Sequence, residues 1–176
     1  MENTVTSHKV TSHLTKGLII SLVLIVISIA TQFTGTEQSA LAKWGSVAIF
    51  FAGIIWACIS YGKDMNHAVT FGNTFAHGFK TTAVITVIVI LFTIAFMLIF
   101  PEMVDKQMNI AREEMEKQGN LTDDQIDTAM GITKKFFIPI AIGSIMLLYV
   151  FMGAIASLIG AAVTKKNPPT PFTNQA

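Results

Sequence analysis

Four long apolar runs constrain this chain more than any other feature. The runs are Gly17–Phe33, Trp44–Gly62, Ala83–Phe100 and Phe136–Val163, and none contains Asp, Glu, Lys, Arg or His. About 20 apolar residues in a helix cross the roughly 30 Å hydrocarbon core of a bilayer, because each residue advances the helix by about 1.5 Å. The sequence therefore predicts an all-α integral membrane bundle of four transmembrane helices.

Composition supports this class. The chain has 176 residues, of which 52% are hydrophobic and 13% are charged, whereas a soluble domain averages about 25% charged residues. Four spans and their connectors use nearly the whole length, so we expect one membrane domain with no attached soluble enzyme domain. The net charge of +1 does not favour nucleic acid as a partner, and the lipid bilayer is the expected surrounding.

The first run raises the alternative of a cleaved signal peptide, because Lys9 and Lys16 precede it. The apolar core of a signal peptide is usually about 7–15 residues long. The run Gly17–Phe33 is longer and uninterrupted. We therefore interpret it as a retained helix.

The pattern divides the chain into three parts: a flexible N-terminal segment at 1–13, a four-helix transmembrane domain at 14–166 and a disordered C-terminal tail at 167–176. The predicted spans cover about residues 14–34, 43–62, 79–100 and 136–163, and an extramembrane helical hairpin covers 102–135. The third helix is expected to begin before its span, near Phe71. Thr70 can cap that start by accepting a hydrogen bond from a first-turn N–H.

The hairpin segment carries its own start and stop signals. Gly119-Asn120 is typical of a helix end. The following Thr122-Asp123-Asp124-Gln125 matches a capping box, which starts a new helix. We predict two helices, near 102–118 and 123–135, and the last apolar run can continue directly from the second.

Small residues recur every four positions in the last run. Gly153, Ser157 and Ala161 form one row, and Ala156 and Gly160 form another. Small side chains let helices approach closely in membranes. We expect this face to pack inside the bundle, with contact to a second copy or to another membrane protein as the alternative.

The most suggestive polar group near the membrane consists of Asp64, His67, His77 and Lys80. Two histidines beside a carboxylate can bind a transition metal. No second pair accompanies these histidines, so solvated side chains at the membrane interface are the favoured interpretation. We expect no cofactor, because no motif for a phosphate loop or a catalytic nucleophile is present.

Three functions stay open at this point. The first is a non-enzymatic accessory or scaffold component, since the apolar runs hold no ionisable residue. The second is a small transporter or channel component for a neutral or lipid-like solute, lined by hydroxyls. That path would need several of these side chains to converge on one cavity: Ser21, Ser28, Thr31, Gln32, Thr86, Thr93 and Ser144. The third is an intramembrane enzyme built around Asp64, His67, His77 and Lys80.

The orientation of the chain in the membrane is predicted from how Lys and Arg residues are distributed between its two sides. With four spans, both termini and the segment Lys63–Lys80 share one side, and each side holds six cations. Five of the six on the terminal side lie within a few residues of a span end, against three on the other side. Cations flanking spans favour the cytoplasm. We therefore expect both termini to be cytoplasmic and the hairpin to lie outside, although Lys134-Lys135 argues against this.

Three segments, taken in order, resemble a known family. The segments are the acidic stretch that ends in Lys134-Lys135, the small-residue end before Lys165-Lys166, and a box formed by Phe71, Gly72, Phe75, Gly78, Phe79 and Lys80. They are similar to the bacterial family called domain of unknown function forty-one ninety-nine. The resemblance covers roughly Leu14 to Lys166. It implies four helical spans in a bacterial inner membrane. The family has no assigned activity, so no catalytic residue is implied.

Overall fold

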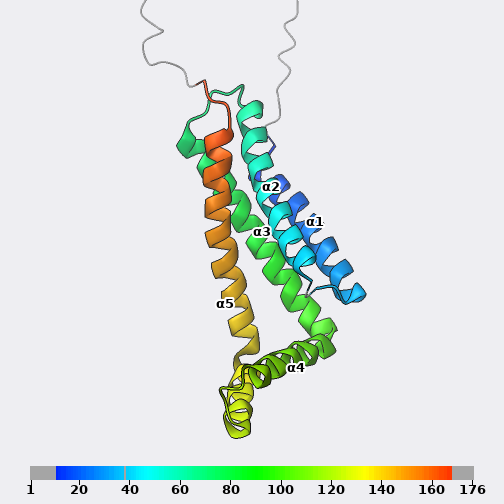
Figure 1. Cartoon of the computed structure of the whole chain (residues 1–176). Coiled ribbons are helices and arrows are strands. Elements are labelled where there is room, and N and C mark those ends of the chain that lie inside the picture. The colour runs from blue at the N-terminus through cyan, green and yellow to red at the C-terminus, as the bar shows by residue number, and fades with distance from the viewer. Residues whose placement is uncertain (1–10, 38, 168–176) are drawn as a thin grey trace, which may run out of the picture. The chain divides into compact units, whose positions relative to one another are not determined.

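The computed structural model describes residues 11–37 and 39–167, and these form five α-helices with no strand. The helices are α1 (His13–Thr34), α2 (Ala40–Asp64), α3 (Phe71–Ile99), α4 (Pro101–Gln118) and α5 (Asp123–Val163) (Figure 1). By length and composition, α1, α2, α3 and α5 can cross a membrane. The predicted all-helical fold with four apolar spans is confirmed. Most of the expected N-terminal segment and tail, residues 1–10 and 168–176, lies outside the described residues.

Local capping explains where the helices begin and end. The Ser12 and Ser39 side chains accept hydrogen bonds from the N–H groups of Leu14 and Ala42, at 3.1 and 3.2 Å, and so start α1 and α2. Gly35 ends α1 in the left-handed conformation, with φ of 66°. The short link makes α1 and α2 antiparallel neighbours (Figure 1).

The start of α3 follows the expected signal. Thr70 Oγ1 accepts a hydrogen bond from the Asn73 N–H at 3.2 Å, and the helix begins at Phe71. The capping box before α5 also forms in part, since Gln125 Oε1 accepts from the Thr122 N–H at 2.9 Å. The helix that begins there is α5, one helix of 41 residues with Pro139 inside it, so the second hairpin helix and the last apolar run are continuous, as the sequence allowed.

The chain forms two compact units. The first contains residues up to Ile88 together with those from Leu148 onward, so it holds α1, α2, the first part of α3 and the last part of α5. The second is Val89–Leu147, which holds the end of α3, all of α4 and the beginning of α5.

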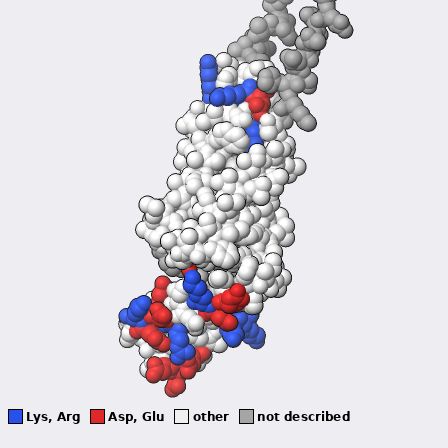
Figure 2. All heavy atoms as spheres, turned by 90° about the vertical axis from the view of Figure 1, so that its right-hand side faces the viewer, with Lys and Arg blue, Asp and Glu red and all other residues white. Residues whose placement is uncertain are grey.

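Charged side chains cover α4 and the beginning of α5 in the second unit (Figure 2). Arg112 of α4 bridges to Asp127 of α5 at 2.9 Å and to Glu116 at 2.9 Å. The hydrogen bond with Glu116, together with the negative charge of Asp127, raises the pKa of the Arg112 guanidinium. Met108 and Ile126 are buried, so the hairpin has a small apolar centre beneath an exposed ion-pair network.

The first unit is held by close approach of α2, α3 and α5 around Cys58. Cys58 and Ser157 are fully buried. A Cβ on Gly78 would lie 2.6 Å from Cys58 Sγ and 2.9 Å from Ser157 Oγ. A Cβ on Gly160 would lie 2.8 Å from the same Sγ and 3.2 Å from the Cα of Ile55. Glycine is therefore needed at both places for the backbones to come this close.

The rest of the predicted small-residue face lies in the same interface. Gly153 packs directly against the Thr82 side chain of α3. Ala156 and Ala161 have no exposed surface. All five residues of this face are buried within the chain, with α3 packed against it at Gly153 and α2 at Gly160.

Replacing Gly160 or Gly153 by a larger residue should destabilise the first unit. Gly160→Leu forces side-chain atoms into Cys58 and the α2 backbone, and Gly153→Leu forces them into Thr82. Overpacking of this kind costs roughly 1–3 kcal/mol or more. We expect a lower midpoint of thermal unfolding in detergent, measured by circular dichroism.

Gly143→Leu is the matched control, because no heavy atom lies within 4 Å of a Cβ built at this position of the same helix. Its unfolding midpoint should stay near that of the unaltered protein. Equal midpoints for all three variants would contradict the packing role.

Candidate functional site

An ion pair between a fully buried lysine and an aspartate with 19% of its side chain exposed lies at one end of the first unit. Lys16, in the first turn of α1, has a fully buried side chain, and its Nζ lies 3.2 Å from Oδ2 of Asp64, the last residue of α2. The Thr11 N–H donates to the same oxygen at 3.2 Å. The antiparallel arrangement of α1 and α2 brings the start of one helix beside the end of the other. A charge buried this way is stable only with its partner in place.

His77 of α3 lies beside this ion pair and joins α1 and α2 through its ring. Its imidazole stacks on Tyr61 of α2, with ring centroids 4.2 Å apart and planes at 11°. The His13 ring of α1 meets it edge-on at 6.1 Å. Lys16, Asp64 and Lys80 all lie within electrostatic range of His77. Side chains from three helices therefore fix the orientation of this imidazole.

A polar cavity of about 330 Å³ opens beside this cluster. Its lining consists of Thr11, Ser12, His13, Tyr61, Asn73, Ala76, His77 and Lys80. A smaller group of charged side chains marks the same end of the first unit in Figure 2. Two imidazoles, an ammonium group, hydroxyls and an amide thus face one space.

The structure brings together only part of the predicted polar group. Asp64, His77 and Lys80 lie at the same end of the unit. His67 instead lies against the segment after α5: its Nδ1 is 3.1 Å from the Lys165 carbonyl oxygen, and its own carbonyl accepts from the Asn167 N–H at 2.7 Å. Among the residues that the structure describes, no group of three or more His, Cys, Asp or Glu side chains is placed to hold a metal ion.

Residues of the phenylalanine–glycine box divide between two faces of α3. Gly78 and the neighbouring His77 turn inward. Phe71 and Phe79 are exposed, and Phe75 stacks on Phe79 with centroids 5.9 Å apart. The Lys166 ammonium lies 5.7 Å above the Phe71 ring. Gly72 lies on the exposed side, where only the Thr70 hydroxyl comes near it.

Sequence reasoning missed Lys16 as a site residue, because it treated this lysine as an ordinary cation flanking an apolar run. The ionisable side chain in fact lies within α1 and has no exposed surface. A usable signal was present: in an antiparallel hairpin the residues just before the first run and just after the second must meet. Lys16 directly precedes the first run, and Asp64 is the second residue after the second run.

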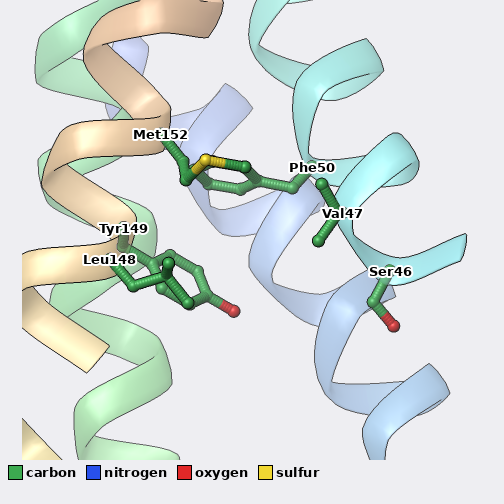
Figure 3. A pocket seen from close by; sticks show the side chains of 6 residues that line it. All are labelled: Ser46, Val47, Phe50, Leu148, Tyr149 and Met152. Carbon is green, nitrogen blue, oxygen red and sulfur yellow. The ribbon is translucent and has the colours of Figure 1, made fainter. Parts of the chain in front are cut away.

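A second cavity, of about 140 Å³, lies between α2 and α5 within the first unit (Figure 3). It is lined by Ser46, Val47, Phe50, Leu148, Tyr149 and Met152. Phe50 and Tyr149 meet edge to face, with centroids 5.0 Å apart. The lining is apolar except for two hydroxyls, so this cavity suits a hydrocarbon group rather than a charged one.

Three of the hydroxyls expected for a solute path bond to backbone carbonyls of their own helices. Ser21 donates to the Leu18 carbonyl at 2.9 Å, Thr31 to Ile27 at 3.0 Å and Thr86 to Thr82 at 2.9 Å. None of the seven side chains required for such a path lines either of the two cavities above.

The chain belongs to a defined family of membrane proteins. The model of the family described as "Protein of unknown function (DUF4199)" matches residues 15–166, a range that covers α2, α3 and α5 and all but the first two residues of α1. The resemblance in the sequence is thereby confirmed. No curated protein and no solved structure matches the chain.

Breaking the buried ion pair should destabilise the first unit strongly. Asp64→Asn leaves the Lys16 ammonium buried without a counter-charge, and removal of one partner from such a pair costs about 3–5 kcal/mol. Adding Lys16→Met to this variant should recover much of the loss, since no buried charge then remains. Unfolding in detergent with a double-mutant cycle measures both effects.

Lys117→Met provides the control, because Lys117 forms a wholly exposed pair with Glu113 at 3.6 Å. This change should alter stability little. A cycle in which Asp64→Asn and Lys16→Met act independently would show that the two charges are not coupled.

Proposed function

We propose that this protein is a non-enzymatic accessory or scaffold component of a bacterial inner membrane. The supporting observation is that several polar groups within the first unit are engaged by the chain itself. Asp64 is engaged by Lys16 and Thr11, and hydroxyls within the spans bond to backbone carbonyls. A carboxylate held in this way is poorly suited to act as a general base.

A scaffold needs a surface for its partner, and α5 offers one. Its small-residue face is buried against α2 and α3. The opposite face exposes Leu148, Phe151 and Leu158, with 57%, 64% and 48% of their surfaces accessible. These positions follow helical spacing, so they form one stripe. We propose that another membrane protein, in addition to lipid, contacts the chain along this stripe.

Photo-crosslinking in intact membranes tests the proposal. A photoreactive residue at Phe151 should yield a discrete adduct with a second polypeptide, and the protein should migrate on native gels above its monomer mass. Leu22 of α1, 51% exposed, is the matched control and should yield lipid adducts only. Lipid adducts alone from both positions, with monomeric migration, would overturn the proposal.

A small transporter or channel for a neutral or lipid-like solute is the alternative function. The apolar cavity at Phe50 and Tyr149 is the feature that favours it. Reconstituted protein would then carry such a solute across liposome membranes. On the accessory proposal, flux stays at the level of protein-free liposomes.

The proposed orientation has both termini in the cytoplasm and α4 in the periplasm. It rests on the flanking cations, among them Lys63, Lys80 and Lys165, which would lie beside the anionic inner leaflet and gain about 1 kcal/mol each at most. In a Cys58→Ala background, Asn120→Cys should react with a membrane-impermeant thiol reagent in intact spheroplasts.

Asn174→Cys in the same background should react only after lysis. The opposite labelling pattern would reverse the orientation. Labelling of both positions from outside would mean that one apolar helix does not span the membrane.

A further inference from the structure

Among the described residues, those that line the cavity beside His77 supply hydrogen-bond donors and include no acidic side chain. Lys80 contributes an ammonium group, His13 and His77 contribute imidazoles, and Ser12 and Asn73 contribute a hydroxyl and an amide. The nearby carboxylate, Asp64, is not part of the lining and is bound to Lys16 and Thr11. The lining therefore favours an electron-rich, anionic ligand over a cation.

His77 gives a second and independent indication of a ligand. The residue is only 8% exposed, and its Nε2 is buried with no hydrogen-bond partner among the described residues. Buried polar atoms in folded proteins nearly always have a partner. Stacking on Tyr61 holds the ring in place. With the imidazole proton on Nε2, a ligand oxygen at this cavity would supply the acceptor that this nitrogen lacks.

We propose that this cavity binds a phosphate group, with Lys80 and the two imidazoles as its principal donors. A phosphate presents several acceptor oxygens and a full negative charge, and charge-assisted hydrogen bonds to it are the strong kind. The volume of about 330 Å³ is ample, since one water occupies roughly 30 Å³ in the liquid. The site holds a phosphate and a small substituent such as glycerol.

Two sources can present this chemistry: the headgroup of an anionic phospholipid and a soluble phosphate ester. The surroundings favour the lipid. Leu14 and Phe79 adjoin cavity residues in the sequence and are exposed, at 58% and 37% of their surfaces. Acyl chains can lie against these apolar side chains while the headgroup enters the cavity. This inference does not depend on the accessory role proposed above.

Calorimetric titration of the full chain in an uncharged detergent tests the site. The probes are dihexanoyl phosphatidylglycerol, zwitterionic dihexanoyl phosphatidylcholine and glycerol 3-phosphate. We expect the anionic lipid to bind most tightly. Lys80→Met and His77→Gln should each weaken that binding by about ten-fold or more, because each removes one donor to a charged acceptor.

Lys63→Met is the control, since Lys63 is exposed at the same end of the unit but lies outside the cavity lining. It should change the affinity by no more than about two-fold. Lys80 is itself exposed, so its replacement tests the site even if His77→Gln impairs folding. Tight binding of glycerol 3-phosphate with the same residue dependence would support the phosphate site and make the source soluble. Equal losses for Lys63→Met and Lys80→Met, or no binding of any probe, would overturn the proposal.

Discussion

The first unit depends on how closely α2, α3 and α5 can approach at Cys58. Apolar helices gain little by associating in lipid, because hydrocarbon tails are as apolar as their side chains, so contact has to come from tight packing. Gly78 and Gly160 leave room for the Cys58 side chain, and Ser157 fills the remaining space. The arrangement brings His77, the residue before Gly78, to a defined place at the end of the unit.

The ionic cluster is built on this packing and adds a different kind of constraint. Lys16 and Asp64 tie α1 to α2, and His77 stacks on Tyr61 to bring in α3. Apolar packing tolerates small rotations of a helix, whereas a buried ion pair requires two particular atoms to meet. The polar end of the unit thus fixes helix register. It also leaves a cavity whose donors come from α1, α2 and α3 and from the residues before α1.

Much of the fold could be predicted because its signals are local. Apolar length identified the four long helices, and side-chain oxygens marked starts such as that of α3 at Phe71. The second hairpin helix continues past Lys134 and Lys135 into the last apolar run, since these lysines change the polarity of the chain without interrupting its backbone hydrogen bonding. A change from charged to apolar residues marks a change of surroundings, and a helix can continue through it.

The sequence by itself determined the class of protein, the all-helical fold and the family, since each depends on composition, run length and ordered motifs. Only the tertiary structure decided which polar residues meet. His67 and His77 resemble one another in the sequence, yet His67 lies against the Lys165 carbonyl while His77 lines the cavity with His13. Lys16 was interpreted from the sequence as a cation flanking an apolar run, and it is buried in the structure for the same reason. Which side chains share a space depends on how helices distant in the sequence are packed and rotated, and local periodicity does not encode that.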